Sequence, residues 1–295
     1  MAWTLAVTGL LLATLALPAA AAVAGVATRH RPPLWLVKSN DLAALEQQAA
    51  LDGTALRSFT WVGCGGQSDP DPCHARQDPI FTSYWTLRAR ARAKWAGTAI
   101  FDIEGWHDTP AHQRLHPQSW ICRAARLHRI DRRLKVIITP WTKPDSVMIA
   151  EEVAAAKCGA YGVDIQSQFI NGRPRALARF IHKAVRAIRR ASRHVIILAG
   201  LATNYPQVVS ARVLTADYNA AQAGGVQGFW LNAKEWLGRN RCTATQGGAG
   251  CPQIGVQFLA DIGMTRAARR PVARLVTPEA GVAPGLVRAT GSPLW

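Results

Sequence analysis

Short apolar runs alternate with helical patterns along most of the chain. Each run spans five to seven residues and is nearly continuous in apolar, often β-branched side chains, as expected for strands covered on both faces. We predict strands at residues 34–38, 57–62, 98–103, 135–140, 161–166, 194–200, 227–232 and 254–259. Apolar residues at helical spacing fill most intervals, and we predict helices at residues 41–50, 81–96, 117–129, 145–157, 174–191 and 207–223.

Eight strands separated mostly by helices predict an α/β fold of the (β/α)8 TIM-barrel class. The alternative is a doubly wound open sheet. That fold favours a glycine-rich, phosphate-binding turn after the first strand, and residues 37–43 (VKSNDLA) contain none. We place the barrel domain at residues 30–265 and a basic tail containing proline and glycine at residues 266–295.

The N-terminus has the pattern of an export signal. Residues 1–28 contain no charged side chain, and an apolar run is followed by Pro18 and four alanines. We therefore predict a signal peptide over residues 1–22 and a secreted, extracellular protein. An uncleaved membrane anchor is the alternative, and Arg29 and Arg31 would then hold the body in the cytoplasm.

The spacing of the six cysteines predicts disulfides, which fit an exported protein. Two short glycine-containing loops are each bounded by a pair of cysteines, and two further cysteines remain to pair with each other. The expected bonds are Cys64–Cys73, Cys242–Cys251 and Cys122–Cys158. Metal ligation is the alternative, but the chain has no CxxC, and the adjacent Cys73 and His74 do not have a zinc-site spacing.

The net charge of +17 is concentrated in three helical stretches at residues 87–94, 122–133 and 173–194. One interpretation is a solvated outer face. The other is attraction to an anionic polymer, for which nucleic acid is the weakest candidate because no nucleic-acid-binding motif accompanies the charge. We expect a monomer whose main partner is a glycan or cell-wall polymer.

Polar residues collect where the predicted strands end, which is where a TIM barrel carries its chemistry. Because residues two apart share a face of a strand, many of them would point into one barrel mouth. This set comprises Lys38, Asn40, Asp102, Glu104, Thr139, Trp141, Asp164, Gln166, Gln168, Asn204, Trp230, Asn232, Gln257 and Asp261. A general polarity of loops is the alternative. However, Asp102, Glu104 and Asp164 have apolar neighbours, which indicates that these carboxylates are partly buried.

Aromatic residues add to this picture, whereas other catalytic signals are missing. The chain has eleven tryptophans, and five fall at or just past strand ends: Trp61, Trp106, Trp141, Trp230 and Trp236. Such rings stack on sugars, although they also fill barrel mouths as packing. The segment HQRLH (112–116) lacks the glutamate of a zinc HExxH motif, and there is no GxSxG. We expect no metal and no other cofactor.

Two segments resemble TIM-barrel glycoside hydrolases. AYGVDIQSQ (160–168) is similar to the fourth-strand signature of the chitinase-like family, a Gly-Val-Asp-Ile-Asp-x-Glu pattern that ends in the catalytic acid. Here Gln166 and Gln168 stand where that family has its second Asp and its Glu, so this strand lacks the acid. FDIEGWHDTP (101–110) supplies a same-face Asp-x-Glu pair, and the chain resembles in general form secreted, uncharacterised barrel proteins of actinobacteria.

We therefore predict a secreted carbohydrate-active barrel of the glycoside-hydrolase type. Glu104 is the expected acid, Asp164 the expected base or nucleophile, and Asp102 would raise the pKa of Glu104 through its like charge. The expected substrate-binding residues are Lys38, Trp106, Trp141, Gln166, Trp230 and Asn232. Two alternatives remain: a non-catalytic glycan or cell-wall binder, and a secreted phosphodiesterase in which His107 is the acid.

Overall fold

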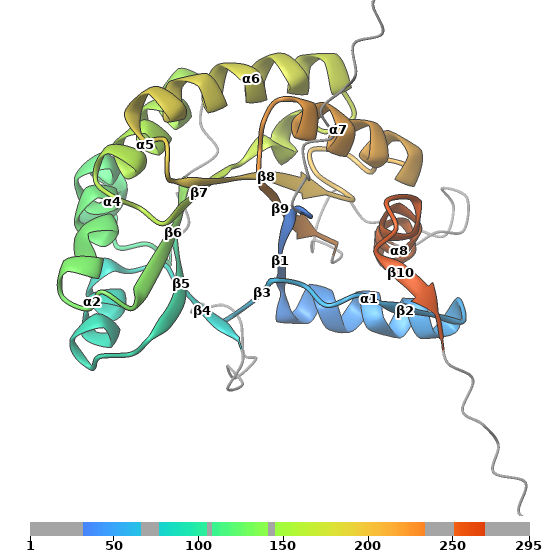
Figure 1. Ribbon diagram of the computed structural model, residues 1–295, viewed down its shortest axis with the longest axis horizontal. Helices are drawn as coiled ribbons and strands as arrows, with labels where there is room; N and C mark the ends of the chain where they lie inside the picture. Colours follow the sequence, from blue (N-terminus) through green and yellow to red (C-terminus); the bar gives the residue numbers. More distant parts are fainter. Residues whose placement is uncertain (1–31, 66–76, 105–107, 141–144, 234–250, 269–295) are drawn as a thin grey trace, which may run out of the picture. The chain divides into compact units, whose positions relative to one another are not determined.

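Eight parallel strands close into a barrel in a computed structural model of the chain (Figure 1). The structure describes residues 32–65, 77–104, 108–140, 145–233 and 251–268. In barrel order the strands are β1 (Leu34–Lys38), β3 (Trp61–Cys64), β4 (Asp78–Phe81), β5 (Gly97–Ile103), β6 (Leu134–Pro140), β7 (Gly162–Ile165), β8 (Ile196–Ala202) and β9 (Gly228–Asn232). Strand β9 pairs with β1 and completes the ring, so the predicted (β/α)8 TIM barrel is confirmed.

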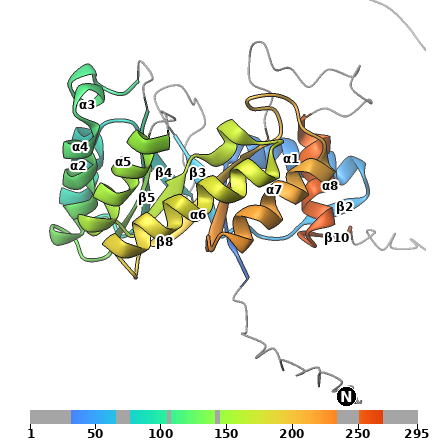
Figure 2. The same ribbon diagram turned by 90° about the horizontal axis from the view of Figure 1, so that it is seen from above.

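Helices cover the outside of the barrel. They are α1 (Ser39–Leu51), α2 (Tyr84–Arg92), α3 (Ala111–Leu115), α4 (Pro117–Ala125), α5 (Asp145–Lys157), α6 (Pro174–Ala191), α7 (Ala211–Ala223) and α8 (Cys251–Asp261), with short 3-10 turns η1 (Arg126–Arg129) and η2 (Ser167–Ile170). Figure 2 shows α5, α6 and α7 packed side by side, and α8 closes the ring against α1. The predicted limits of α5 and α6 are confirmed, because both helices have a strong apolar or amphipathic pattern.

The prediction of a strand at residues 254–259 is wrong. This run lies inside α8, where Ile254 and Phe258, four residues apart, are both buried on one face. Gln257 and Asp261 therefore bond to each other on an exposed helix surface, with 2.8 Å between Nε2 and Oδ1, and not at a barrel mouth. A six-residue apolar run is too short for its period to distinguish a strand from a helix.

One of the eight barrel strands, β4, is not predicted by the sequence patterns. It is the third strand in barrel order. It has only four residues, DPIF, and Asp and Pro are both depleted in strands. The predicted helix 81–96 begins later, at Tyr84, and the predicted strand 57–62 begins at Trp61. With β4 in place, β5 is the fourth barrel strand and β7 is the sixth.

The core has two apolar layers separated by the barrel wall. Side chains alternate along each strand, so on β5 Ile100 points into the barrel, while Phe101 and Ile103 pack under the helices. The inner layer contains Leu36, Trp61, Ile80, Ile100, Ile137, Leu198 and Trp230. On β5 the next inward residue towards the carboxyl end is Asp102, so a polar layer follows the apolar one.

A two-stranded ribbon extends the described fold beyond the barrel. Strand β2 (Thr54–Leu56), which follows α1, pairs antiparallel with β10 (Thr265–Ala267). The predicted signal peptide and the tail beyond residue 268 lie outside the described residues. Within the described ranges, no helix has both the length and the apolarity needed to cross a membrane.

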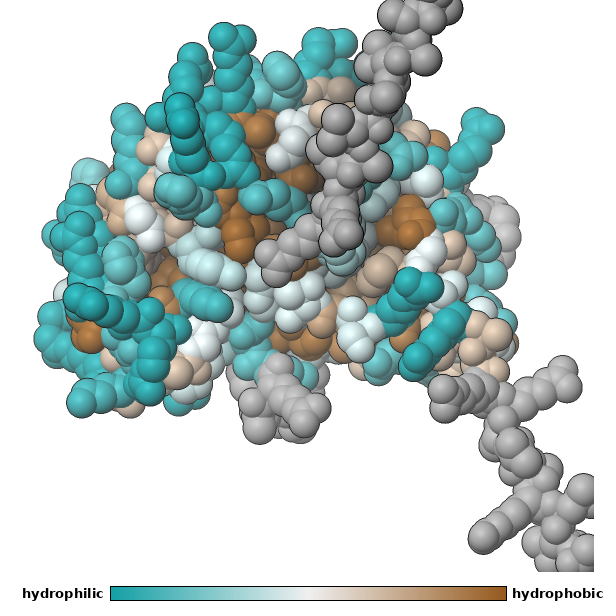
Figure 3. All heavy atoms as spheres, viewed as in Figure 1, coloured by the Kyte–Doolittle hydropathy of each residue, from teal (hydrophilic) through white to brown (hydrophobic). Residues whose placement is uncertain are grey.

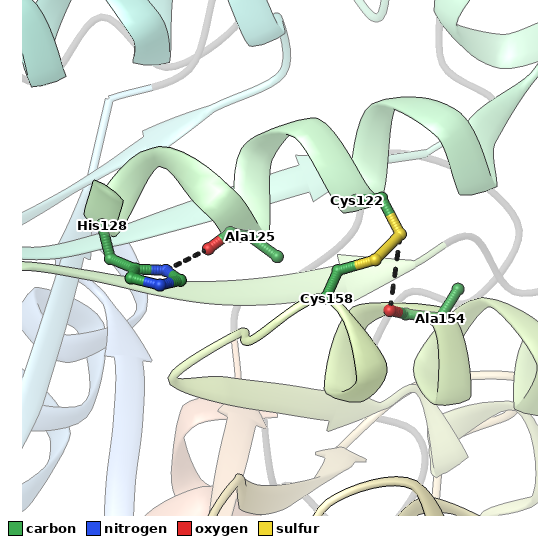
Figure 4. The surroundings of a disulfide bond; sticks show 5 residues. All are labelled: Cys122, Ala125, His128, Ala154 and Cys158. Atoms are coloured by element: carbon green, nitrogen blue, oxygen red, sulfur yellow. Dashed lines mark hydrogen bonds between the residues drawn. A yellow bond between two sulfur atoms is a disulfide. The ribbon is translucent and has the colours of Figure 1, made fainter. Parts of the chain in front are cut away.

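The disulfide Cys122–Cys158 joins α4 to the end of α5, as predicted (Figure 4). Its Cα atoms are 5.1 Å apart, and the two cysteines are 36 residues apart in the sequence. Nearby, His128 Nδ1 lies 2.7 Å from the carbonyl oxygen of Ala125. Cys64 and Cys251 are also disulfide-bonded. Their expected partners, Cys73 and Cys242, lie outside the described residues, so these two pairings stay predictions.

Replacing Cys122 and Cys158 together by Ser should lower the free energy of unfolding by about 2–4 kcal/mol, because the bond restricts a long loop of the unfolded chain. Urea denaturation followed by tryptophan fluorescence measures the change. The double variant, unlike added reductant, leaves the other disulfides intact. An unchanged midpoint at an unchanged slope would show that this bond does not stabilise the fold.

Candidate functional site

Three carboxyl groups lie together at the carboxyl end of the barrel. Asp102 is the penultimate residue of strand β5 and Glu104, two residues later, lies on the same face just after the strand, while Asp164 belongs to β7. The side chains of Asp102 and Asp164 are 9% and 2% exposed. The structure therefore brings together the three residues that strand alternation predicted as catalytic candidates.

A chain of hydrogen bonds links β7 to Glu104 across the intervening strand β6. Gln168 donates through Nε2 to Oε1 of Gln166 at 2.6 Å, and Gln166 donates through Nε2 to Oε1 of Glu104 at 2.9 Å. Gly200 on β8 leaves space for this chain, because a Cβ atom there would collide with the amide of Gln168. The two glutamines thus hold the Glu104 carboxyl group in one orientation.

The carboxyl groups of Asp102 and Glu104 lie close enough for each to change the pKa of the other. Burial raises the pKa of Glu104 well above its ordinary value, and the charge of Asp102 raises it further, while Gln166 and Lys38 oppose the rise. Burial also raises the pKa of Asp102, which is opposed by Lys38 and by hydrogen bonds from Glu104 and Thr139. Of the two, Glu104 therefore binds a proton more readily and Asp102 is the better anion.

Asp164 is protonated near neutral pH. Burial, followed by the charge of Asp102, raises its pKa to about 8. Behind it on α5, the fully buried Glu152 also has a pKa well above its ordinary value, because of burial and then the charges of Asp164 and Glu151. The burial of Glu152 cannot be predicted from the sequence pattern, because a glutamate inside a helix is usually solvent-exposed.

Lys38 and Trp230 lie beside the carboxyl groups. Lys38 ends β1, and its Nζ is 5.8 Å from the centroid of the Trp230 ring on the neighbouring strand β9. Trp230 is only 4% exposed and packs in the inner apolar layer. Asn232, half-buried, ends the same strand. Trp106 and Trp141 lie outside the described residues.

Several buried polar atoms at this end of the barrel have no hydrogen-bond partner within the described structure. They are Asp102 Oδ1, Asp164 Oδ1, Gln168 Oε1 and Trp230 Nε1. Buried polar atoms in folded proteins are nearly always satisfied by protein, water or ligand. This group of donors and acceptors is therefore suited to a polar ligand with hydroxyl groups.

The other candidates from the sequence do not join this site. In the described ranges, no three His, Cys, Asp or Glu side chains are grouped so that they could hold a metal ion. His112 lies on α3, where its carbonyl oxygen accepts a 3.3 Å hydrogen bond from Nε1 of Trp120 and its ring packs against that indole. His107 lies outside the described residues.

Comparison with known proteins gives no family. The sequence matches no protein-family profile and no curated protein. Among solved structures, a variant of Rhizobium etli pyruvate carboxylase crystallised without acetyl coenzyme A has a TM-score of 0.42 and 11% identity, covering 79% of this chain and 28% of that chain. The carboxyl transferase domain of that enzyme with pyruvate and biocytin has a TM-score of 0.42 and 11% identity, covering 79% and 46%. The chain thus spans less than half of either structure, and no conclusion about its chemistry follows.

Changing Asp164 to Asn should flatten the dependence of stability on pH. The pKa of Asp164 is raised to about 8 in the folded protein, so between about pH 4 and 8 the folded state keeps a proton that the unfolded state has lost. Stability therefore falls as pH rises through this window, by up to about 1.4 kcal/mol per pH unit for one proton. Asn carries no such proton, so the variant should gain stability relative to the original protein as pH rises.

Urea denaturation at pH 5, 6, 7 and 8 tests this prediction. The free energy of unfolding of Asp164→Asn, relative to that of the original protein, should rise across the series by up to about 1.4 kcal/mol per pH unit, the slope expected for one proton. Asp52→Asn, which alters an exposed carboxyl group after α1, serves as the matched control. Parallel profiles for the original protein and Asp164→Asn would contradict a proton held by Asp164.

Proposed function

We propose that this protein is a TIM-barrel glycoside hydrolase in which Glu104 protonates the leaving-group oxygen. One observation carries the proposal: the Asp-x-Glu pair, buried Asp102 and half-buried Glu104, lies at the carboxyl end of the barrel, where Gln166 holds the Glu104 carboxyl group at 2.9 Å and the pKa of Glu104 is raised well above its ordinary value. An acid catalyst must hold its proton near the working pH, and burial beside a second carboxyl group achieves this.

The position of the pair in the barrel adds support. The chitinase-like signature lies on the fourth strand in that family, whereas the similar segment here, residues 160–168, contains the sixth barrel strand, β7. The fourth barrel strand is β5, which carries the Asp-x-Glu pair. This chain thus has an acid, Glu104, at the end of the same barrel strand that carries the catalytic acid in the chitinase-like family. Gln166 and Gln168 then position this acid.

The geometry gives each residue a distinct task. Gln166 donates to one carboxyl oxygen of Glu104 and orients the group. When Glu104 releases its proton, two negative carboxylates face each other, and the positive charge of Lys38 offsets their repulsion. Lys38 therefore makes the acid stronger than burial alone would leave it.

Asp102 is too close to Glu104 to serve as the separate nucleophile or base of the usual two-carboxylate mechanisms, which need about 5–9.5 Å between carboxyl groups. Asp164 holds its own proton near neutral pH. The pair consequently acts as one acid, and the attack on the anomeric carbon comes from a substrate group or a water molecule. Substrate-assisted glycoside hydrolases operate with such an arrangement.

Export forms part of the same proposal. The uncharged residues 1–28 have the pattern of a secretory signal, and the Cys122–Cys158 bond fits an oxidising compartment. A secreted barrel with an acid in its mouth fits a polysaccharide outside the cell as substrate.

A non-catalytic glycan binder is the second candidate. It is favoured by Gln166 and Gln168, because amides in place of acids bind sugar hydroxyl groups without cleaving a bond. In that case the same buried polar atoms would hold the glycan, and no product would form.

Glu104→Gln should lower the turnover of a polysaccharide substrate by about 100-fold or more, because Gln keeps the size of the side chain but supplies no proton. Product chromatography on a panel of cell-wall and storage glycans measures turnover, and calorimetry on the same panel measures affinity. Affinity and thermal stability should change little. Glu46→Gln, which makes the same change at an exposed position on α1, is the matched control and should retain full activity.

Lys38→Met gives an independent readout of the same acid. Loss of the positive charge should raise the pKa of Glu104 further, so the alkaline limb of the pH–rate profile should move to higher pH. Full turnover by Glu104→Gln would contradict the acid role. Tight binding of a glycan without any product from the original protein would favour the binder.

A further inference from the structure

The solvent-facing side of α6 is a continuous ridge of positive charge. Its exposed members are Arg175, Arg179, Lys183, Arg186, Arg190 and, just after the helix, Arg193. Successive members are three or four residues apart, which places them on one face of the helix, about 4.5–6 Å apart along its axis. Figure 3 shows hydrophilic side chains gathered along the upper edge of the molecule, where α6 lies in Figure 1.

No acidic side chain balances this ridge. The sequence contains no Asp or Glu between Asp164 and Asp217, and both of these residues are buried. On the neighbouring helix α5, Glu151 and Glu152 are fully buried as well. Within the described part of the chain, none of the ridge residues makes an ion pair.

The ridge ends in a shallow hollow of about 470 Å³. Its lining consists of Arg186, Arg189, Arg190, Ala191, Ser192 and Arg193. One wall is held in place by Arg189, which donates to the carbonyl oxygens of Arg193 at 3.1 Å and Val195 at 2.6 Å, and to Oε1 of Gln227 at 2.6 Å. Several arginine side chains thus surround the hollow.

A purely structural role accounts for only part of this charge. Cations near a helix C-terminus offset its dipole, but that dipole amounts to about half an elementary charge. Like charges four residues apart, such as Arg175 with Arg179 and Arg186 with Arg190, destabilise a helix. A face that serves only solubility usually mixes both signs, and α6 does not.

We propose that the exposed face of α6 binds a linear polymer that carries phosphate groups, with successive phosphates along the ridge and one phosphate in the hollow beside Arg189. Five of the six ridge residues are arginines, whose guanidinium groups form bidentate hydrogen bonds with phosphate. The spacing of the ridge suits a chain with regularly repeated anions.

The surface itself argues for a polymer in solution over a lipid membrane. Within the described ranges, the exposed large apolar side chains are Leu51, Trp85, Leu115, Ile130 and Val147, and none of them belongs to α6. A helix that lies in a membrane interface inserts an apolar face, whereas the apolar face of α6 is packed against the barrel. The only Phe, Tyr or Trp residue of α6, Phe180, is buried, and the imidazole of His182 is the one exposed ring on this helix, so α6 lacks the row of exposed aromatic rings on which successive nucleic-acid bases stack.

This site is separate from the carboxyl groups of the barrel mouth. The hollow adjoins the segment that leads into the start of β8, whereas the candidate acid lies at the carboxyl ends of the strands. A bound polymer would hold the protein in place while leaving the mouth open. The proposal does not depend on the barrel being an enzyme.

Binding of the full chain to fluorescently labelled long-chain polyphosphate, measured by anisotropy over a series of salt concentrations, tests the proposal. The triple variant Arg179→Gln, Lys183→Gln, Arg186→Gln should weaken binding about tenfold or more. The slope of log affinity against log salt should fall by about two to three, as three phosphate contacts are lost. The matched control removes the same charge from exposed positions on α2 and η1, as Arg90→Gln, Arg92→Gln, Arg129→Gln, and should weaken binding less than about threefold.

Binding of tripolyphosphate tests the hollow separately from the ridge. Tripolyphosphate is too short to follow the ridge, and Arg190→Gln with Arg193→Gln should weaken its binding about tenfold, while the α2 and η1 control should not. Near-UV circular dichroism checks that each variant keeps its fold.

Three results would overturn the proposal: no binding of polyphosphate, equal losses in the ridge and control variants, or tighter binding to phosphatidylglycerol vesicles than to polyphosphate. A strong preference for single-stranded DNA over polyphosphate at equal phosphate concentration would also contradict it, because it would require base recognition. Loss of glycan turnover in Glu104→Gln with unchanged polyphosphate binding would confirm that the two sites are separate.

Discussion

Desolvation of carboxyl groups inside the barrel mouth is the constraint on which the candidate site depends. Removing a carboxylate from water costs several kcal/mol even after the protein relaxes. Asp102, Glu104 and Asp164 lie close together, and among the described residues Lys38 is the cation that offsets the charges of Asp102 and Glu104. The three groups therefore cannot all ionise near neutral pH. Burial raises the pKa of Asp164 to about 8 and that of Glu104 well above its ordinary value, while Asp102 is a better anion than Glu104.

The inner apolar layer creates this environment. Leu36, Ile100, Leu198 and Trp230 fill the barrel below the carboxyl groups, so neither water nor flexible polar side chains approach from that direction. On the open side, the amides of Gln166 and Gln168 approach instead. Amides donate hydrogen bonds without adding charge, so they fix the orientation of Glu104 and oppose the rise of its pKa only moderately.

Strand alternation was sufficient to predict that Asp102, Glu104 and Asp164 meet at one end of the barrel, because it depends only on a period of two and on parallel strands. The course of individual segments was harder to predict. The strand β4 contains Asp and Pro, which are commoner in turns than in strands, so the sequence pattern does not predict it. Residues 254–259 are predicted as a strand but belong to helix α8. The burial of Glu152 depends on which face of α5 meets the barrel, and the bond from Gln166 to Glu104 depends on tertiary contact. Neither can be derived from local sequence.

Burial controls the pKa values of the carboxyl groups inside the barrel, whereas water and salt control how far the positive charges on the surface act. A net charge of +17 would favour ionised carboxylates if its field reached them, yet burial raises the pKa of Asp164 to about 8. The exposed cations of α6 are surrounded by water and salt, which screen them over about 8 Å, and an apolar layer separates that helix from the barrel interior. Desolvation therefore prevails over surface charge inside the barrel. The protons that it retains make the real charge of the protein more positive than the formal count, which strengthens the field that the surface presents to anions.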